Sequence, residues 1–147
     1  MLKLREIMTA PVVSATPDMT LREAMALLSD RHISGAPVVS GGKVVGVFSS
    51  TDLLVYIAEL DAAQPSVSFR RRQTPLEELT VSEVMTRGAK SLPPDCPADL
   101  AAGFMQRARI HRVLVMDGEQ LLGIVTTTDL ARAIAEHRVT TRTHALG

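Results

Sequence analysis

The chain has 147 residues, of which 46% are apolar and 3% aromatic, and its 16 basic and 16 acidic residues cancel to zero net charge. This length suits one domain or two small units, and the balanced charge gives no whole-molecule reason to bind nucleic acid or an anionic membrane. A single cysteine excludes an intramolecular disulfide framework and favours a reducing, cytoplasmic location. We expect neither a signal peptide nor a transmembrane helix, since the charged start and the short apolar runs match neither pattern.

An internal repeat organises the chain. The stretch GVFSSTDL at residues 46–53 returns as GIVTTTDL at residues 123–130, an offset of 77 residues. At this offset residues 6–59 align with residues 83–136 without a gap and are identical at 17 of 54 positions. Self-similarity at a fixed period is the signature of a repeated structural unit, so we predict two copies of one unit.

Each copy predicts the same elements in chain order. The first copy begins with an extended piece at 11–15, followed by a helix from Leu21 whose apolar residues recur three and four positions apart. Two β-branched runs separated by Gly41 and Gly42 then predict a hairpin, and the repeated stretch begins a second helix. The second copy has the same order, with an extended piece at 89–93 and a hairpin turn at Asp117 and Gly118.

These elements predict an α+β (α/β) fold of two pseudo-symmetric β-α-β-β-α units. We expect the two units to pack sheet to sheet, because three strands and two helices cannot bury both faces of a sheet alone. The predicted boundaries are a first unit at 4–60, a linker at 61–80, a second unit at 81–138 and a tail at 139–147. Within the linker, the run of Arg70, Arg71 and Arg72 favours a solvated charge patch over an anion site.

The repeated stretch permits two interpretations. Ser49 with Asp52, like Thr126 with Asp129, matches the hydroxyl-x-x-acid pattern of a helix capping box, in which the preceding glycine only lets another backbone approach closely. However, each copy clusters further hydroxyls where a strand runs into a helix, and a helix N-terminus favours anions. An ionised aspartate at that place is purely an acceptor, suited to the two hydroxyls of a ribose.

The chain as a whole resembles a tandem pair of CBS domains, the family named after cystathionine β-synthase. The resemblance covers residues 4–138 and rests on the ordered pieces IMT, VVSATPDMTLREAMALLSDRHISGAPVVSGGKVVGVFSSTDL, VMT and KSLPPDCPADLAAGFMQRARIHRVLVMDGEQLLGIVTTTDL. It implies a regulatory sensor that binds AMP, ADP, ATP or S-adenosylmethionine in clefts between the repeats. It also implies a homodimer, in which two pairs form a flat disc through their helices, and a partner protein that reads the ligand-dependent orientation of the repeats.

The resemblance further implies roles for individual residues. The carboxylates that would accept the ribose hydroxyls are Asp52 and Asp129. The hydroxyls that would contact ribose or phosphate belong to Ser49, Thr51, Thr126 and Thr128. The backbone groups that would meet the adenine edge belong to Gly35, Ala36, Arg112 and Val113. The residues near the base would be Val13 and Lys90, and those near a phosphate would be His111 and Arg112.

The two copies differ beside this predicted site. His111 and Arg112 of the second copy correspond to Ser34 and Gly35 of the first, so we predict that a phosphorylated adenosine binds one cleft better than the other. Arginine forks are strong partners for a desolvated phosphate. The alternative for the basic stretch 107–112 is a solvated helix end, where the helix dipole favours cations.

Other chemistry has little support in the sequence. Cys96 lies between Asp95 and Pro97 and predicts a buried or loop thiol, and the four histidines show no metal-ligand spacing. No nucleophile elbow is present, so we predict a regulatory module that is not an enzyme. The alternatives are a structural or dimerisation module with empty clefts and a nucleic-acid-binding module, which the lack of aromatic stacking residues opposes.

Overall fold

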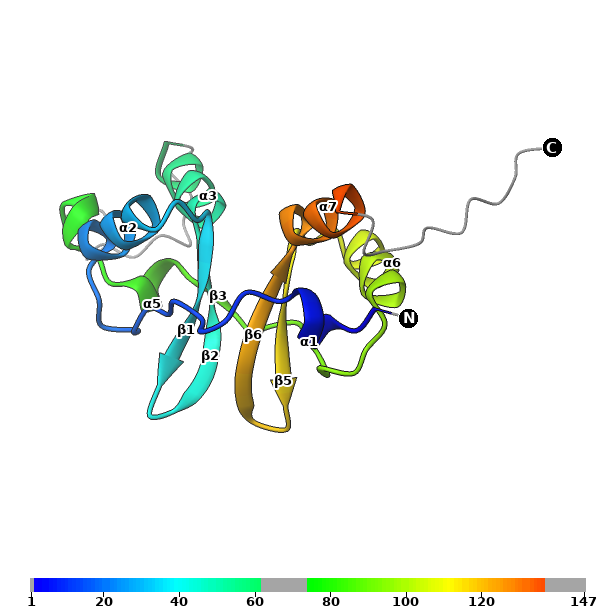
Figure 1. Ribbon diagram of the computed structural model, residues 1–147. Helices are drawn as coiled ribbons and strands as arrows, with labels where there is room; N and C mark the ends of the chain where they lie inside the picture. The colour runs from blue at the N-terminus through cyan, green and yellow to red at the C-terminus, as the bar shows by residue number, and fades with distance from the viewer. Residues whose placement is uncertain (1, 62–73, 137–147) are drawn as a thin grey trace. The chain divides into compact units, whose positions relative to one another are not determined.

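The computed structural model describes residues 2–61 and 74–136 (Figure 1). The arginines at 70–72 and the tail at 139–147 lie outside these residues, so what was predicted for them stays a prediction. The chain divides into two compact units. We call them the N-repeat unit (Val13–Ala89) and the C-repeat unit (Met1–Val12 with Lys90–Gly147).

The N-repeat unit is built on an antiparallel sheet in the order β1-β2-β3. Its hairpin of β1 (Gly35–Ser40) and β2 (Lys43–Ser49) turns at Gly41 and Gly42, whose φ values of 58° and 79° are those that a tight hairpin turn requires. The third strand is β3 (Thr86–Arg87), which pairs with β2. The helical segments are α2 (Leu21–Asp30), α3 (Ser50–Asp61), the 3-10 turn η1 (Leu76–Glu78) and α5 (Val81–Val84).

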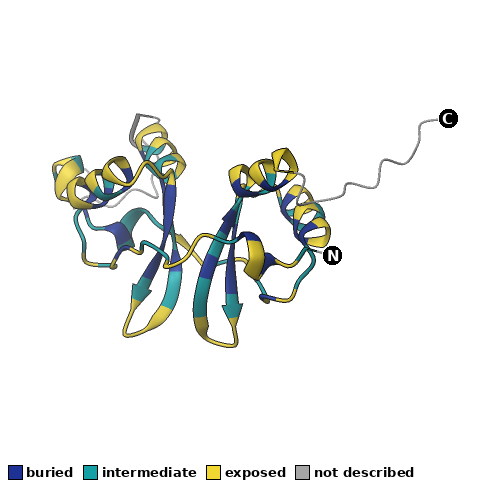
Figure 2. Ribbon diagram, viewed as in Figure 1, coloured by how far each residue is buried: buried dark blue, intermediate teal, exposed yellow. Residues whose placement is uncertain are grey.

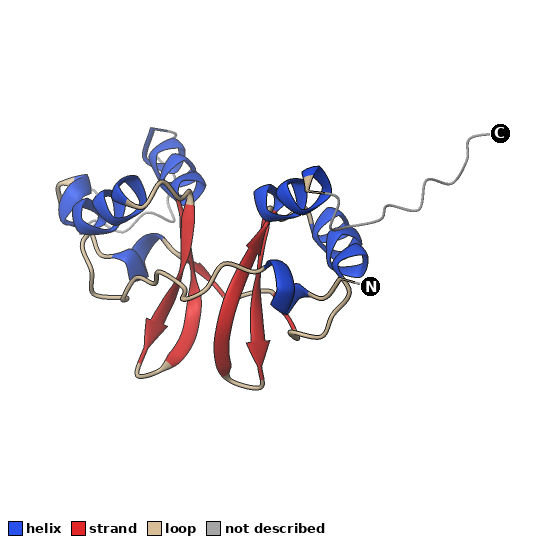
Figure 3. Cartoon of the chain, in the orientation of Figure 1, coloured by secondary structure: helices blue, strands red, loops and turns tan. Residues whose placement is uncertain are grey.

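The C-repeat unit repeats this plan, as the two hairpins in Figure 3 show. Its sheet has the order β4-β5-β6, with β4 (Ser91–Leu92) parallel to β5 (Arg112–Asp117) and β5 antiparallel to β6 (Gln120–Thr126). The helices are α1 (Leu4–Ile7), α6 (Ala98–Ala108) and α7 (Thr127–Ala135). Both hairpins have a register shift at the same repeat position, after Val38 and after Val115.

The predicted fold class is confirmed, since each unit mixes helices with a three-stranded sheet. The long helices and both hairpins lie where the sequence predicts them. The extended piece at 11–15 is shorter than predicted, because only Ala15 pairs with the sheet, through a parallel bridge to Val38. The short helical segments α1, η1 and α5 were not predicted, since three or four residues are too few to show a helical period. Sheet-to-sheet packing of the two units stays a prediction.

Each compact unit combines the beginning of one sequence repeat with the rest of the other repeat, so the repeats exchange their beginnings. In the C-repeat unit the amide of Leu4 donates to the carbonyl of Cys96 at 3.0 Å, and Thr9 pairs with Ile124. In the N-repeat unit the amide of Val81 donates in the same way to the carbonyl of Met19 at 2.8 Å. The start of each repeat therefore completes the unit formed by the rest of the other repeat.

Each unit has its own hydrophobic core, drawn in dark blue in Figure 2. The buried cluster of the N-repeat unit consists of Leu21, Ala24, Leu28, Ala36, Val38, Phe48, Tyr56, Leu79 and Val81. The cluster of the C-repeat unit consists of Leu4, Ile7, Ala98, Ala101, Met105, Val113, Val115, Val125 and Ala133. Helices α2 and α6 contribute buried residues three or four apart, and strands β1 and β5 contribute alternate residues, as amphipathic elements require. Within the part of the chain that the structure describes, no helix is both long and apolar enough to cross a lipid bilayer.

Candidate functional site

Asp52 lies in the first turn of α3, directly after β2 ends. Its Oδ2 accepts the backbone N–H of Ser49 at 2.8 Å and the hydroxyl of Ser49 at 3.1 Å, and its own N–H donates to the Ser49 hydroxyl at 3.4 Å. This reciprocal pair satisfies N–H groups that the start of a helix leaves without partners. The capping interpretation of the repeated stretch is therefore confirmed in the N-repeat unit.

The other carboxylate oxygen of Asp52 is held from a different part of the sequence. Thr86, in β3, donates its hydroxyl to Oδ1 of Asp52 at 2.7 Å. Thr86 belongs to the start of the second repeat, 34 residues away, and no local sequence pattern predicts this contact. The signal that could have found it is the Met-Thr pair, which recurs unchanged at Met8-Thr9.

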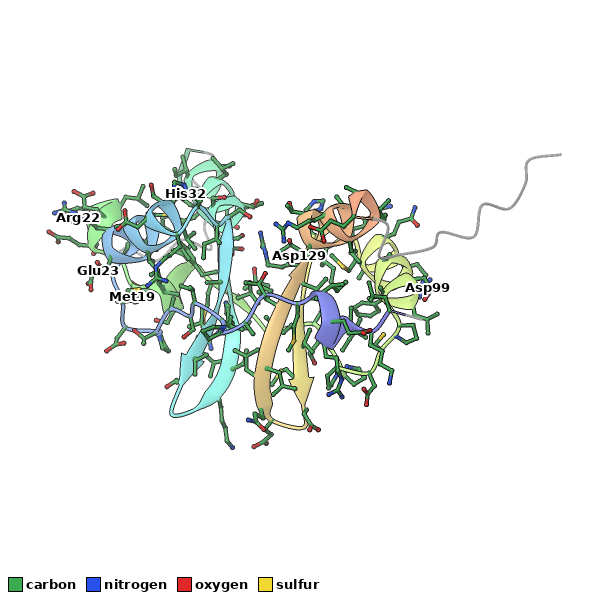
Figure 4. The ribbon with its side chains drawn as sticks, viewed as in Figure 1. Met19, Arg22, Glu23, His32, Asp99 and Asp129 are labelled. Carbon is green, nitrogen blue, oxygen red and sulfur yellow. The ribbon has the colours of Figure 1, made fainter. Side chains whose placement is uncertain are left out.

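Asp129 has the equivalent place at the start of α7, where it is labelled in Figure 4. Its Oδ2 accepts the backbone N–H of Thr126 at 2.8 Å and the Thr126 hydroxyl at 3.1 Å, while its own N–H donates to that hydroxyl at 3.2 Å. Thr9 donates its hydroxyl to Oδ1 at 3.3 Å. The two repeats thus build the same four-group arrangement of carboxylate, cap hydroxyl, cap amide and distant threonine.

Asp129 has one contact that Asp52 lacks among the described residues. Arg132, one turn further along α7, donates Nη1 to Oδ1 of Asp129 at 3.2 Å. Asp129 is only 5% exposed, whereas Asp52 is half-buried and pairs with no cation among the described residues. The electrostatic surroundings of the two equivalent carboxylates therefore differ.

Gly46 and Gly123 leave room for the segments that carry Thr86 and Thr9 to lie close to β2 and β6. A Cβ on Gly46 would lie 2.5 Å from the carbonyl oxygen of Thr86, and one on Gly123 would meet the side chain of Met8. Neither glycine has a positive φ, so the requirement is space rather than backbone conformation. The predicted close approach of another backbone is confirmed at Gly46, whereas at Gly123 it is the Met8 side chain that approaches.

The backbone predicted to meet the adenine edge lies beside the cap in each unit. Gly35 pairs with Ser49, and Arg112 pairs with Thr126. The next residues along β1 and β5, Ala36 and Val113, are buried in the cores. Each unit therefore presents one strand start next to one helix start, which is the juxtaposition that the predicted adenosine site needs.

Four predicted site residues make no hydrogen bond or ion pair with Asp52 or Asp129 among the described residues. Thr51 and Thr128 are exposed on the first turns of α3 and α7. Lys90 is exposed, its carbonyl accepting the N–H of Leu114 at 3.1 Å, and Val13 is half-buried. Within residues 2–61 and 74–136, no hydrogen bond or ion pair joins these four side chains to either carboxylate, and their predicted roles stay untested.

The basic stretch of the second copy contains two different environments. Arg107 lies in the last turn of α6, and Arg109 follows as its C-cap in a left-handed conformation with φ 56°, so these two match the helix-end interpretation. Arg112 instead begins β5, while the carbonyl of His111 accepts the N–H of Thr127 at 3.0 Å. The helix-end alternative therefore does not describe His111 and Arg112.

An apolar hollow of about 620 Å³ lies between α6 and α7 of the C-repeat unit, with Arg109 and His111 among the residues that line it. Its apolar lining includes Met105, Ile110, Leu130 and Ile134.

Among the described residues no three His, Cys, Asp or Glu side chains gather as a metal site would require. Burial raises the pKa of the Cys96 thiol, with a smaller contribution from Asp99, which keeps the thiol in its less reactive form at neutral pH.

Comparison with known proteins identifies the family. The family model of the CBS domain matches residues 4–59 and 81–136, which are the two repeats and most of the chain. The chain belongs to the CBS domain family. Among curated proteins, the CBS domain-containing protein YhcV of Bacillus subtilis is 30% identical over 131 residues, covering 89% of this chain and 84% of YhcV.

Solved CBS pairs share the fold. The CBS domain pair of protein MJ0100, solved in complex with 5′-methylthioadenosine and S-adenosyl-L-methionine, aligns with a TM-score of 0.76 and 26% identity over 93% of this chain and 98% of that chain. Some CBS relatives are much longer. The chain spans 40% of the length of protein MJ1232 of Methanocaldococcus jannaschii. It spans only 21% of the inosine-5′-monophosphate dehydrogenase of Korarchaeum cryptofilum, so it matches a part of that enzyme.

Proposed function

We propose that the protein is a regulatory module that binds an adenosine-containing compound at the capped aspartates of its CBS repeats. One observation carries the proposal: each repeat sets an aspartate of the same motif at a helix start, beside the start of a strand. The MJ0100 pair, which is 26% identical, was solved with two compounds that both contain adenosine. The chemistry that these compounds share is an adenine base and a ribose with two adjacent hydroxyls.

The geometry suits that shared chemistry. A ribose diol offers O–H donors, and an ionised carboxylate has about four acceptor positions, two of which the cap occupies, so an aspartate can keep its cap and accept a ribose hydroxyl at an open position. The neighbouring N–H groups at the start of α3 and α7 attract negative groups of the ligand, such as a phosphate or a carboxylate. Apart from Asp52 and Asp129, the residues proposed to form the binding surfaces are Ser49, Thr51, Gly35, Ala36, Val13, Thr126, Thr128, His111, Arg112, Val113 and Lys90.

The regulatory role follows from differential binding. A ligand that contacts both a strand start and a helix start binds one arrangement of these elements more tightly than another, and so shifts the population toward it. A partner protein that recognises this arrangement then reads the ligand concentration. In this proposal the module performs no chemistry itself and acts in the cytoplasm.

We also propose that the protein is a homodimer. Large apolar side chains are exposed on its helices, with Leu54 67% and Ile57 39% exposed on α3 and Ile134 47% exposed on α7. Exposed apolar side chains three positions apart, as on α3, share a helix face, and such a face is typical of an interaction site. Light scattering at micromolar concentration tests this, and a monomeric mass with and without ligand contradicts it.

The binding proposal is tested by thermal unfolding with AMP, ADP, ATP, S-adenosylmethionine and NAD, followed by calorimetry with each compound that raises Tm. A compound at 100 times its Kd stabilises the folded state by about 2.7 kcal/mol if it binds one site and not the unfolded chain. The matched control is the double variant Asp52→Asn and Asp129→Asn, which keeps the side-chain size and removes both charges. Stabilisation of the wild type that persists unchanged in this control would show that the ligand does not use the aspartates.

A structural module with empty clefts is the second candidate, because both caps are complete without a ligand. It predicts no response to any adenosine compound in the same screen. A nucleic-acid-binding module predicts instead an affinity that falls steeply with salt concentration and that AMP does not reduce.

A further inference from the structure

The two capped aspartates differ in how many acceptor positions their contacts leave open. In both, Oδ2 receives two donors, the N–H and the hydroxyl of the cap residue. Oδ1 of Asp52 receives one further donor among the described residues, the hydroxyl of Thr86 at 2.7 Å. Oδ1 of Asp129 receives two, from Thr9 at 3.3 Å and from Arg132 at 3.2 Å.

This count matters because a carboxylate has about four lone-pair positions. Among the described residues, donors occupy all four positions at Asp129 and three of the four at Asp52. Exposure points the same way, since Asp129 is 5% exposed and Asp52 is half-buried. A hydroxyl that approaches Asp129 must displace a donor, whereas one that approaches Asp52 can add to the donors already there.

The cause lies at a single repeat position. Arg132 corresponds to Val55 at the offset of 77 residues, and both follow their aspartate by three positions on the helix. Residues three apart share a helix face, so Arg132 reaches the carboxylate, while the aliphatic side chain of Val55 has nothing to donate. The Arg132 side chain is 58% exposed while that of Asp129 is 5% exposed, so Arg132 contacts both the covered carboxylate and solvent.

We propose that Arg132 closes Asp129 to ligands and that Asp52 alone is the carboxylate that binds the ribose. This inference rests on the proposed adenosine-binding function and assigns it to one of two repeats that the motif makes equivalent. Arg132 is then a specificity-determining residue, and the residue at this repeat position decides how many ligands the chain binds. The wild-type protein binds one adenosine compound per chain.

The test exchanges the residues at this position, in the variants Arg132→Val and Val55→Arg. Calorimetry with AMP and, separately, with S-adenosylmethionine gives the stoichiometry and Kd for each protein. We expect one site in the wild type, two sites in Arg132→Val, and a loss of at least tenfold in affinity in Val55→Arg. Adding Asp129→Asn to Arg132→Val returns the stoichiometry to one, and Asp52→Asn in the wild type lowers the affinity at least tenfold.

A matched control removes an arginine that touches neither carboxylate. Arg107 is exposed in the last turn of α6, so Arg107→Val keeps the wild-type stoichiometry and Kd. Circular dichroism and light scattering verify that every variant keeps the fold and mass of the wild type. Two equal sites in the wild type, or one site in a folded Arg132→Val, overturn the proposal, as does an Arg132→Val protein that binds less tightly, since Arg132 would then itself hold the ligand.

A second measurement needs no ligand. Carbodiimide-activated coupling of glycine ethyl ester to carboxylates, read by peptide mass spectrometry, reports how accessible each aspartate is. We expect Asp52 to react several-fold faster than Asp129 in the wild type, Arg132→Val to raise the rate at Asp129, and Val55→Arg to lower it at Asp52. If neither probe binds the wild type or Arg132→Val, the proposed function and the ribose assignment both fail. The labelling rates still decide separately whether Arg132 closes Asp129, and an unreactive Asp129 in Arg132→Val shows that it does not.

Discussion

At the scale of single residues, Asp52 and Asp129 have a structural task that does not depend on any ligand. Each caps a helix through one oxygen and receives a threonine from the other repeat through the second. A cap contributes about 1 kcal/mol to stability, and a hydrogen bond to a charged group somewhat more than one between neutral groups. Substitution of these aspartates therefore changes both stability and binding, and the two effects must be measured separately.

The Thr86 hydroxyl can be tested without touching the aspartate. Thr86→Val keeps the β-branched shape and removes the donor to Oδ1 of Asp52, so we expect it to lower the free energy of unfolding by roughly 1 kcal/mol, as for one exposed hydrogen bond. Urea denaturation measures the loss. Thr86→Ser keeps the hydroxyl and should recover most of it, and equal losses in both variants would show that the side-chain shape matters rather than the hydrogen bond.

The two close-approach glycines are expected to respond unequally to alanine. The new Cβ of Gly46→Ala meets the backbone oxygen of Thr86, which the pairing of β2 with β3 holds in place, so the variant should lose about 1–3 kcal/mol of stability. The Cβ of Gly123→Ala meets a flexible methionine side chain that can turn away. Urea denaturation of both variants compares them, and a larger loss for Gly123→Ala would contradict this ranking.

At the scale of elements, the beginning of each repeat docks on the other repeat by the same backbone bonds. Arg5 donates its N–H to the carbonyl of Pro94 at 3.0 Å, as Ser82 does to the carbonyl of Pro17 at 2.9 Å. An ion pair joins α1 itself to the C-repeat unit, because Arg5 donates Nη2 to Oδ1 of Asp95 at 2.6 Å where the N-repeat unit has Ser82. Among the described residues of the N-repeat unit, an ion pair of Arg22 with Glu77 at 3.5 Å instead joins η1 to α2. The docking of α1 therefore includes an ion pair at the position where α5 has a serine.

This difference predicts a pH dependence confined to α1. The hydrogen bond from Arg5, followed by the charges of Arg5 and Lys3, holds the pKa of Asp95 below its usual value in the folded state. A lowered folded-state pKa contributes stability that is present above the unfolded pKa of about 3.9 and is lost as pH falls through the folded value. We therefore expect the protection of the Leu4 and Arg5 amides against hydrogen exchange to fall below about pH 4.

The N-repeat unit supplies the internal control for that measurement. The amides of Val81 and Ser82 make the equivalent backbone bonds without an ion pair, so their protection factors should hold over the same pH range. In Arg5→Gln the pH dependence at Leu4 should weaken. A parallel fall at all four amides would indicate general acid unfolding instead.

At the scale of the whole molecule, the exchange of repeat beginnings decides which part of the chain can fold alone. Residues 13–89 contain one complete compact unit, whereas residues 1–77 have the same length but lack Leu79 and Val81, both 0% exposed in the core of that unit. We expect the fragment 13–89 to unfold cooperatively and the fragment 1–77 to lack a cooperative transition. Circular dichroism during urea denaturation checks both, and an equally cooperative 1–77 fragment would show that the exchanged segment is dispensable.

The features of this protein that can be predicted from its sequence are those that depend on residues close together in the chain. The repeat, the four long helices, both hairpins and the cap pairs Ser49 with Asp52 and Thr126 with Asp129 follow from short-range patterns, because helix periodicity, glycine turns and capping boxes act over a few residues. The likeness of the two repeats also located the adenosine site that we propose.

Which repeat the segments of Thr9 and Thr86 contact becomes known from the folded structure and not from the sequence. Thr9 and Thr86 lie 120 and 34 residues from the carboxylates they contact, and since both repeats offer the same accepting sheet edge, no local pattern tells which copy receives which segment. The mismatch of Arg132 with Val55 is visible in the aligned repeats, but its meaning depends on a 3.2 Å contact to one covered oxygen. Hydrogen-bond geometry and burial are properties of the folded chain, and they make two equivalent motifs chemically unequal.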